Sequence, residues 1–329
     1  MTLPRVGAVV IGRNEGERFR RCLESLLGAA DPVVYVDSGS TDGSIEHAKS
    51  LGVPVVELDT SIPFTAARAR NAGFERMRAL APELELVMFV DGDCEVARGW
   101  WSDACGFLDE NEAYGVVCGR RKERHPNASI YNYLCDVEWN TPIGDAKACG
   151  GDALMRTEAF AEVGGFNPSL IAGEEPELCV RLRAKGWKIR RIDSDMTLHD
   201  AAMTRFSQWW QRAKRAGHAY AEGSALHGAP PERHWVKETR SIVVWGLGLP
   251  AVSILGAPLS GGLSVGLLAL FPLNALRVGR RLRRDGIERP WVVAAFMMMS
   301  KLPGAAGWIR FQRGRLSGRR SALIEYKQT

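Results

Sequence analysis

Several familiar sequence patterns are missing from this chain, and each absence argues against a class of protein. The seven cysteines are scattered and form neither a CxxC pair nor a Cys/His group with zinc-ligand spacing. We therefore expect reduced thiols in a cytosolic compartment and no structural zinc. No GxGxxG sequence is present, which argues against a dinucleotide-dependent dehydrogenase. The first half has no basic stripe interleaved with aromatic residues, so we expect no nucleic-acid partner.

The start of the sequence also lacks the layout of a signal peptide and enters an apolar run almost at once. This pattern predicts that the first two thirds of the chain are cytosolic. With 329 residues and a formal net charge of +5, the chain is long enough for one large domain and a further segment.

Short apolar runs alternate with segments of helical periodicity in the first half of the chain. The runs are VGAVVIG, PVVYVDS, VPVVEL, LVMFVDG and YGVVCG, which are typical of continuously buried strands. Segments such as AARARNAGFERMRAL lie between them and place apolar residues at i, i+3 and i+4. The alternation predicts an α/β fold with a mostly parallel sheet covered on both faces. Ligands of such sheets bind beyond the carboxyl ends of the strands, where Asp37 and Asp91 stand.

The stretch LVMFVDGDCEV ends an apolar run in two carboxylates, Asp91 and Asp93, separated by Gly92. Carboxylates at a buried strand end are costly unless a cation or an array of donors compensates them. The glycine lets the backbone turn so that both side chains face one pocket. A solvated turn is the alternative interpretation, because Asp and Gly are ordinary turn residues.

Six stretches occur in the order that a nucleotide-sugar site requires: VVIGRNEGE, VDSGSTDGS, AARARNAG, DGDCE, CGGDALMR and GEEPELCVRLRAKGWKI. Together they resemble the family 2 glycosyltransferases, inverting enzymes with the Rossmann-like GT-A fold. The resemblance covers roughly residues 5 to 220. It implies a nucleotide-sugar donor and a catalytic domain over 1–235. The resemblance does not extend to residues 236–329, which we expect to form a membrane-associated region. Within the catalytic domain, about 1–120 would form the nucleotide-sugar half and 121–235 the acceptor half.

The resemblance also assigns residues to the donor. Those expected to bind the nucleotide sugar are Arg13, Asn14, Glu15, Asp37, Arg70 and Asp91. Asp37 would accept a hydrogen bond from a uracil-type N–H, with an Asx turn or a cap as its alternative role. Arg70 would contact the diphosphate. Arg68 is two residues away, so only one of the two arginines should face the pocket.

A divalent cation, Mn²⁺ or Mg²⁺, is implied at the second aspartate of the DxD motif. Asp93 is the expected direct ligand, because hard oxygen ligands hold the cations that neutralise a leaving diphosphate. His199, in TLHDAA, would be a further ligand, and Asp200 would orient its ring. The alternative for His199 is an ordinary histidine satisfied by hydrogen bonds near a strand end.

The segment GEEPEL carries the expected chemistry. Inverting transfer needs a general base beside the acceptor hydroxyl, and Glu175 aligns with the family's aspartate, with Glu174 as the alternative base. Acidic residues that favour a helix N-terminus would explain the same pattern without catalysis. Gly151 would let the backbone approach an acceptor sugar whose hydroxyls Asp152 would bond, whereas a plain glycine turn is the alternative.

The last third of the sequence changes character. Residues 241–276 contain no charge, and a straight helix of that length would run roughly 54 Å, well beyond a hydrocarbon core of about 30 Å. Pro258 and the following glycine pair predict a turn, hence a membrane hairpin. Arginines on both flanks predict that both ends are cytosolic. The basic segment that follows, including Arg310 and Arg313, favours an interfacial helix in contact with lipid head groups.

The family resemblance implies a metal-dependent inverting glycosyltransferase, and the apolar segment with its basic flanks predicts a place on the cytoplasmic side of a bacterial inner membrane. A membrane segment suggests a lipid-linked acceptor, such as a polyprenyl-diphosphate saccharide. One rival is a membrane scaffold that only binds a nucleotide sugar, although Asp93 and Glu175 argue against it. Others are a sugar nucleotidyltransferase, which would need a GxGxR loop where the chain has IGRNEGE, and a buried helical pair in a soluble domain for residues 241–276.

Overall fold

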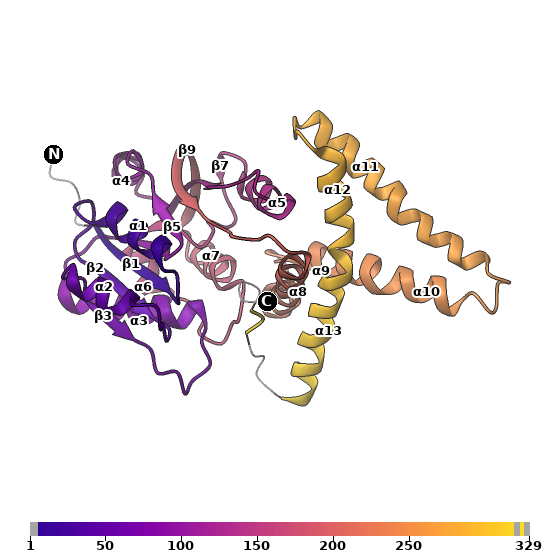
Figure 1. Ribbon diagram of the computed structural model, residues 1–329, viewed down its shortest axis with the longest axis horizontal. Helices are drawn as coiled ribbons and strands as arrows, with labels where there is room; N and C mark the ends of the chain where they lie inside the picture. Colours follow the sequence, from indigo (N-terminus) through magenta and orange to yellow (C-terminus); the bar gives the residue numbers. More distant parts are fainter. Residues whose placement is uncertain (1–5, 319–322, 326–329) are drawn as a thin grey trace. The chain divides into compact units, whose positions relative to one another are not determined.

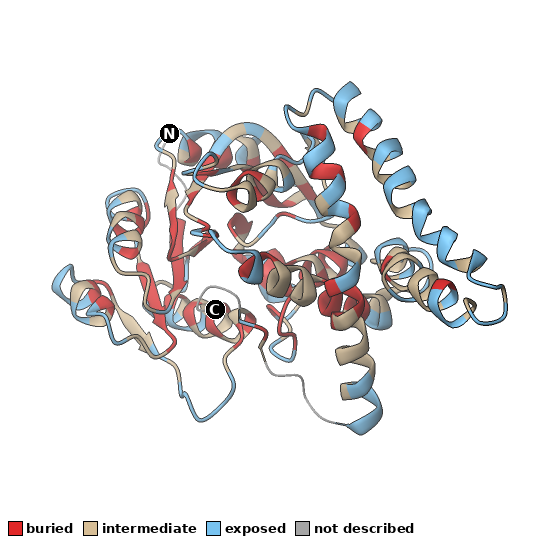
Figure 2. Cartoon of the chain, turned by 45° about the vertical axis from the view of Figure 1, so that its right-hand side comes forward, coloured by how far each residue is buried: buried red, intermediate tan, exposed pale blue. Residues whose placement is uncertain are grey.

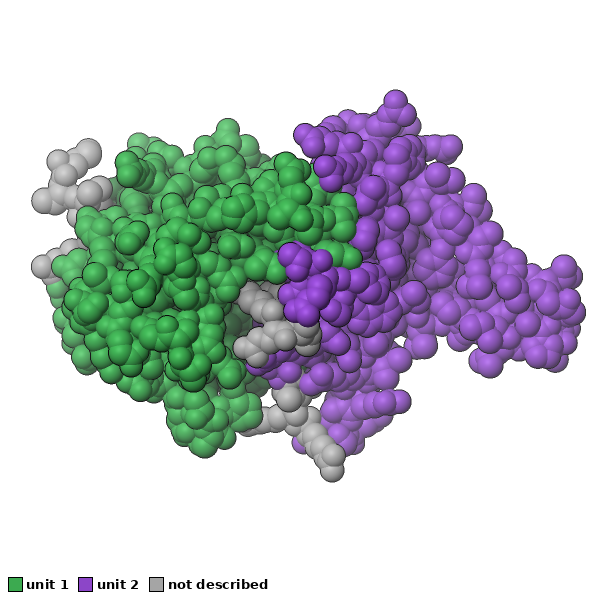
Figure 3. All heavy atoms as spheres, viewed as in Figure 1, with its two compact units in different colours: residues 1–202 green, residues 203–329 purple. Residues whose placement is uncertain are grey.

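The computed structural model describes residues 6–318 and 323–325 (Figure 1). The chain divides into two compact units, one ending at Ala202 and one starting at Met203, coloured green and purple in Figure 3. The division expected from the sequence lies near residue 235, so a long helix assigned there to the catalytic domain belongs structurally to the second unit. Residues 319–322 and 326–329, at the end of the predicted interfacial region, lie outside the described residues.

The first unit is built on one sheet whose first four strands run parallel, in the order β3-β2-β1-β4. These strands are β1 (Val6–Gly12), β2 (Val33–Asp37), β3 (Val55–Glu57) and β4 (Leu86–Asp91). The helices that connect them are α1 (Glu17–Leu26), α2 (Ser44–Ser50) and α3 (Ala66–Leu80). Each connection is a strand–helix–strand unit between parallel strands of the sheet.

The sheet continues past β4 in the order β8-β6-β9-β5, with β7 paired to β9, and this part mixes antiparallel and parallel pairs. Its strands are β5 (Cys94–Val96), β6 (Tyr114–Glu123), β7 (Gly144–Asp145), β8 (Ala153–Arg156) and β9 (Lys188–His199). The accompanying helices are α4 (Trp100–Glu110), α5 (Ile130–Trp139), α6 (Thr157–Glu162) and α7 (Glu174–Ala184).

The core lies on both faces of this sheet. Ala8, Val9 and Val10 are consecutive in β1, and all three are 0% exposed. Because successive strand residues point to opposite faces, both faces must be covered. The predicted α/β fold with a mostly parallel, doubly covered sheet is confirmed.

Strand register brings the predicted site residues to one edge. Gly12 at the end of β1 pairs with Asp37 at the end of β2, and Ile11 pairs with Asp91 at the end of β4. On the other half of the sheet, Cys94 of β5 lies opposite His199 of β9 in an antiparallel pair. Residues far apart in the sequence therefore meet beyond the carboxyl ends of the parallel strands.

The second unit is helical in its described part. Its elements are α8 (Phe206–His227), α9 (Val236–Val243), the π-helical segment Val244–Gly248, α10 (Leu249–Leu255), the 3₁₀ segment Leu263–Ala269, α11 (Leu270–Arg284), α12 (Pro290–Met299) and α13 (Lys301–Ser317). Helices α8 and α13 touch through glycines. A Cβ added to Gly217 would lie 2.2 Å from the carbonyl oxygen of Gly304, so only a residue without a side chain allows this approach, as in membrane-helix packing.

Residues 256–262 form the turn between two helical arms, where Pro258 and the glycine pair predict it. In Figure 2 the arm that contains α11 is largely exposed, and the arm that contains α10 is mostly intermediate. Apolar side chains at the turn are highly accessible: Leu255, Leu259 and Leu263 are 75%, 93% and 83% exposed. Apolar surface on this scale marks a contact with a partner or a lipid phase.

Among the described residues, two helices are long and apolar enough to cross a membrane, as judged by length and composition. Residues Leu263–Arg284 form one, with 6% of its apolar window buried within the protein, and Pro290–Ser317 form the other, with 39% buried. The C-terminal helices are thus apolar enough to associate with a membrane.

Candidate active site

The loop after β1 holds three residues predicted to bind the nucleotide. Arg13 is exposed, and Glu15 forms an ion pair with Arg18 at 2.7 Å. Asn14 adopts a left-handed backbone with φ 55°, and its side-chain oxygen accepts the Thr41 N–H at 2.7 Å. Asn14 therefore joins the loops after β1 and β2. Contacts of these residues with a nucleotide remain a prediction.

Asp37 is 1% exposed, and its carboxylate is engaged by its own loop. One oxygen accepts the N–H groups of Gly39 and Ser40 at 2.7 and 2.8 Å. The other accepts the Tyr35 hydroxyl at 2.6 Å. This is the Asx-turn geometry that the sequence offers as the alternative role. Asp37 shapes the loop at the end of β2, and its contact with a base remains a prediction.

Arg70, on α3, is 2% exposed and lies between two carboxylates of the active-site edge. Its Nη1 donates to Glu174 Oε1 and its Nη2 to Asp91 Oδ1, both at 2.7 Å. Arg68 turns the other way and donates to two backbone carbonyls in the preceding loop. The expectation that only one of these arginines faces inward is confirmed.

A second arginine, Arg121 of β6, completes the cluster. Its Nη2 lies 3.3 Å from Asp91 Oδ2 and 2.6 Å from Asp152 Oδ2. Asp152 is 0% exposed, and it also accepts the Asp91 N–H at 3.0 Å and the Thr197 hydroxyl at 2.8 Å. Asp152 therefore supports Asp91 and Arg121. Its contact with an acceptor sugar, which the resemblance implies, remains a prediction.

Gly151 lies directly against this charged cluster. A Cβ at this position would be 3.1 Å from both Arg70 Nη2 and Asp91 Oδ2, which is closer than a side chain ordinarily tolerates. The missing side chain therefore lets the backbone contact the charged groups. Its predicted contact with an acceptor remains a prediction.

Burial alone would favour the neutral form of Asp91, but Arg70 and then Arg121 outweigh it and lower the pKa of that carboxyl below its usual value. The two guanidinium groups thus favour the ionised form of Asp91, whose side chain is 28% exposed. Ion pairs with carboxylates of the protein itself hold both guanidinium groups in position.

Asp93 and His199 face each other beside this cluster. Both are nearly buried, at 4% and 6% exposure, and His199 Nε2 lies 3.2 Å from Asp93 Oδ2. Asp93, Cys94 and His199 each offer a ligand atom within 4.8 Å of the others. The carboxylate nearest the other ring nitrogen is Glu123, at 3.8 Å. Asp200, expected to orient the ring, instead accepts the Ala202 N–H, so that expectation is corrected.

Burial opposes a charge on His199, yet Asp93 and Glu123 raise the pKa of the imidazole above its ordinary value. The two carboxylates therefore favour the protonated form of the ring. A metal ligand must be a neutral imidazole, so loading a cation here would release this proton.

The two glutamates at the start of α7 differ in their surroundings. Glu174 is bound to Arg70. Glu175, 7% exposed, accepts the backbone N–H of Cys149 at 2.6 Å through Oε1. Both follow Gly173, whose left-handed φ of 80° ends the preceding loop. Because no arginine in the described part of the chain forms an ion pair with Glu175, it is the better placed of the two to accept a proton.

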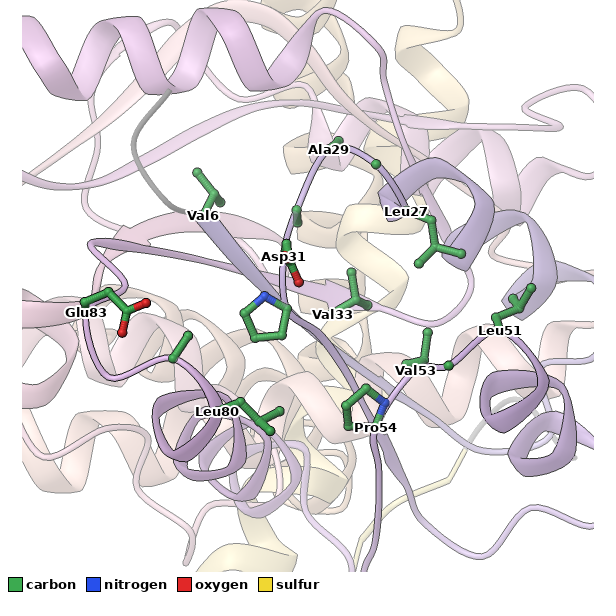
Figure 4. A pocket seen from close by; sticks show the side chains of 15 residues that line it. Val6, Leu27, Ala29, Asp31, Val33, Leu51, Val53, Pro54, Leu80 and Glu83 are labelled. Atoms are coloured by element: carbon green, nitrogen blue, oxygen red, sulfur yellow. The ribbon is translucent and has the colours of Figure 1, made fainter. Parts of the chain in front are cut away.

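A hollow of about 880 Å³ lies at the other edge of the sheet, at the starts of β1 and β2. Figure 4 shows Val6, Val33 and Pro54 pointing toward it, with Asp31 and Glu83 among its few charged neighbours. It contains none of the predicted site residues. The chemistry-bearing side chains lie at the opposite, carboxyl edge.

Residues 8–163 match the sequence model of the family described as Glycosyl transferase family 2. This region is a family 2 glycosyltransferase domain. The chain is accordingly an enzyme of the glycosyltransferase class, and the matched region includes the ends of β1, β2 and β4 together with Asp93.

Curated relatives agree with this domain. "Glycosyltransferase AglE" of Haloferax volcanii is 24% identical over 213 residues, covering 61% of this chain and 68% of its own length. "Pre-mycofactocin glycosyltransferase" of Mycobacterium tuberculosis is 27% identical over 293 residues, covering 85% of this chain. The chain spans only 57% of the length of that mycobacterial relative.

A solved structure has a fold similar to that of this chain. The mannosyltransferase PcManGT from Pyrobaculum calidifontis, determined in complex with GDP-Man and Mn²⁺, gives a TM-score of 0.63 at 20% identity. The match covers 93% of this chain and 87% of that structure. It supports the GT-A fold.

Three side chains of the glycosyltransferase site escaped prediction from the sequence: Arg121, Glu123 and Trp139. The Arg121 guanidinium lies 5.5 Å from the centroid of the Trp139 ring, which in turn meets His199 edge-on at 4.6 Å. Arg121 and Glu123 alternate along β6, which places them on the same face of the strand. The segment YGVVCGRRKE contains this alternation, but nothing in the sequence shows which strand β6 would join.

Proposed function

We propose that the enzyme moves a sugar from a nucleotide-sugar donor to a hydroxyl of a saccharide acceptor, with inversion and with a divalent cation. The observation that carries the proposal is the meeting of Asp93 and His199, 3.2 Å apart, beside carboxylates held by Arg70 and Arg121. A cation between an aspartate and a histidine, next to fixed guanidinium groups, is suited to a diphosphate.

The residues present fit such a cation. Asp93 offers carboxylate oxygen and His199 an imidazole nitrogen, a donor set that suits Mn²⁺ and, less well, Mg²⁺. Asp93 and His199 form a close, buried pair, and a cation bound between them would replace a proton on the imidazole. When bound, the cation would supply positive charge for the leaving diphosphate. The mannosyltransferase PcManGT, whose structure contains Mn²⁺ and GDP-Man, supports the same assignment.

The chain's own residues perform the remaining steps. Arg70, freed from part of its pairing, would donate hydrogen bonds to a diphosphate oxygen, while Asp91 faces the ribose. Glu175 takes the proton of the acceptor hydroxyl as that oxygen attacks the anomeric carbon and the sugar–phosphate bond breaks. Attack opposite the leaving group inverts the configuration.

The helical hairpin supports a lipid-linked acceptor such as a polyprenyl-diphosphate saccharide. The glycosyltransferase has no need of exposed apolar arms for a soluble acceptor, and in water such arms promote aggregation. The basic face of α11, with Arg277, Arg280, Arg281 and Arg284 at i, i+3, i+4 and i+7, suits the anionic head groups of a cytoplasmic leaflet.

The cation assignment is tested by thermal shifts of the full chain in detergent with UDP-, GDP- and dTDP-sugars, with and without Mn²⁺ or Mg²⁺. A ligand at 100 times its Kd stabilises by about 2.7 kcal/mol, so the correct donor should raise Tm, and more so with the cation. Asp93→Asn should lose the cation-dependent part. His199→Ala should weaken cation affinity about 10-fold or more.

Asp109→Asn provides the matched control, because Asp109 is an exposed carboxyl on α4. It should respond to donor and cation like the unaltered chain. Full transfer activity in the presence of a chelator, or an unchanged cation effect in Asp93→Asn, would contradict the metal assignment.

A further inference from the structure

Three buried thiols gather around the carboxylate of Glu175. Cys149 Sγ and Cys179 Sγ lie 3.7 Å apart, and Cys179 Sγ lies 3.2 Å from Glu175 Oε1. Cys149, Cys179 and Glu175 offer ligand atoms that all lie within 4.8 Å of one another. Cys118 of β6 is near enough to interact electrostatically with Glu175 and Cys179. This is a second cluster of metal-ligating groups, made from residues that play no part in the Asp93 pair.

The fold creates the cluster from distant segments. Glu175 and Cys179 are four residues apart on α7 and therefore share a face of the helix. Cys149 comes from the loop before β8, and its backbone N–H already holds Glu175 at 2.6 Å. Because the two cysteines are thirty residues apart, no CxxC spacing in the sequence announces the site.

We propose that Cys149, Cys179 and Glu175 form a second cation site, which takes a thiophilic divalent cation such as Zn²⁺ or Cd²⁺ and thereby inhibits the enzyme. Inhibition follows because a bound carboxylate cannot accept the proton of an acceptor hydroxyl. This part rests on the proposed function of Glu175 as the general base, whereas the cation site itself does not.

The geometry matches a tetrahedral ion. With metal–sulfur bonds of about 2.3 Å, two thiolates on one zinc are separated by about 3.8 Å, close to the observed 3.7 Å. A donor set of two sulfurs and one oxygen selects Zn²⁺ or Cd²⁺ over Mg²⁺ and Mn²⁺. The fourth position remains for a water molecule or an acceptor oxygen.

Metal binding displaces the thiol protons. The Cys149 and Cys179 thiols each lose a proton to solvent when a metal–sulfur bond forms. Two thiols and one divalent cation thus yield two metal–thiolate bonds and two released protons, with no change of oxidation state. Hard cations bind thiolate too weakly to drive this exchange, so the cation at Asp93 is not drawn into the second site.

The test separates this cluster from the Asp93, Cys94 and His199 group, which also contains a thiol. The full chain carrying Cys94→Ser is titrated with Cd²⁺ in detergent, and the ultraviolet charge-transfer absorption of cadmium thiolate is recorded. We expect a band that saturates near one equivalent. Adding Cys179→Ser or Cys149→Ser should weaken Cd²⁺ binding at least 10-fold.

Cys105→Ser is the matched control, because Cys105 is a buried cysteine on α4. It should leave the titration unchanged. The site is overturned if the Cys94→Ser chain shows no band, or if both Cys179→Ser and Cys149→Ser leave the band and its midpoint intact while the chain remains folded by circular dichroism.

Transfer assays then separate the site from the base assignment. With excess Mn²⁺, Zn²⁺ should inhibit the Cys94→Ser enzyme at a concentration at least 10-fold below that needed for the Cys94→Ser/Cys179→Ser enzyme. If Cd²⁺ binds as expected but Zn²⁺ does not inhibit, and Glu175→Gln stays active, the base assignment fails and the inhibitory role is overturned. If Glu175→Gln is inactive and the Cd²⁺ titration gives no band that depends on Cys149 or Cys179, the cation site is overturned while the proposed function stands.

Discussion

Three carboxylates at the active-site edge share two arginines. Arg70 joins Glu174 to Asp91, and Arg121 joins Asp91 to Asp152. In a low-dielectric site, removing one partner of such a pair costs about 3–5 kcal/mol, because it leaves a buried charge uncompensated. The guanidinium groups therefore lie at the active-site edge before a donor arrives, although Arg70 must exchange part of its pairing to bind a diphosphate.

The different partners of Glu174 and Glu175 predict different kinetic roles. Glu175→Gln removes the proton acceptor but keeps the shape of the side chain, so turnover should fall about 10²–10⁴-fold while the donor still binds. Glu174→Gln removes the negative partner of Arg70 and should mainly weaken donor binding. Steady-state kinetics combined with thermal shifts for the donor distinguish the two effects. A crippled Glu174→Gln enzyme beside a mildly affected Glu175→Gln enzyme would reverse the assignment.

At the scale of elements, α8 carries a buried acid that predicts a pH-dependent stability. Burial raises the pKa of Glu222 from its ordinary 4.5 to about 7. Between these values the folded chain binds a proton that the unfolded chain lacks, so this group's contribution to stability falls as the pH rises from about 4.5 to 7. The neighbouring His218, 3.5 Å away, has its pKa lowered to about 4 by burial and by Arg310, and it titrates in the opposite sense.

Glu222→Gln should remove the acid's contribution and leave that of His218. The difference in Tm between the Glu222→Gln chain and the unaltered chain should therefore increase in the variant's favour from pH 5 to pH 8. Glu288→Gln, at an exposed carboxyl, should show a pH-independent difference. Thermal melts of the full chain in detergent measure both. A constant Tm difference for Glu222→Gln across this range would show that the carboxyl is not held in its neutral form.

The elements that sequence patterns predict well are those with local causes. Continuous apolar runs identify the parallel strands, and Asp37 and Asp91 stand at their ends because short connections impose that topology. The glycine pair with Pro258 likewise marks the hairpin turn. The ion pair between Asp152 and Arg121 joins two segments that are distant in the sequence, so no local pattern predicts it.

Elements joined by non-local pairing account for what the sequence does not reveal. The strand β9 pairs in parallel with β6 and antiparallel with β5, and this arrangement brings Glu123 rather than Asp200 to the ring of His199. The cluster of Cys149, Cys179 and Glu175 has the same origin. Local periodicity contains no information about which strands will be neighbours, so these contacts require the structure.

At the scale of the whole molecule, the length of the hairpin decides how it meets a bilayer. The first arm is uncharged from Arg240 to the turn at 256–262, and the second from that turn to Arg277. With helical rises of about 1.5 Å, or 2.0 Å in the 3₁₀ segment, each apolar stretch is roughly 25 Å long, which is less than a hydrocarbon core of about 30 Å. Both charged ends can then lie at one surface while the turn stops short of the other.

We therefore expect the full chain to fractionate with membranes through a hairpin that enters the bilayer from one surface and returns to the same surface. Leu259→Cys, at the turn, should resist a membrane-impermeant maleimide both in intact cells and in inverted vesicles, because its thiol lies in hydrocarbon. Asp285→Cys, at the basic end of α11, should react in inverted vesicles only. The native cysteines are all buried, so background labelling is low. Labelling of Leu259→Cys in intact cells would indicate a complete crossing, and labelling in inverted vesicles alone would place the turn in water and remove the support for a lipid-linked acceptor.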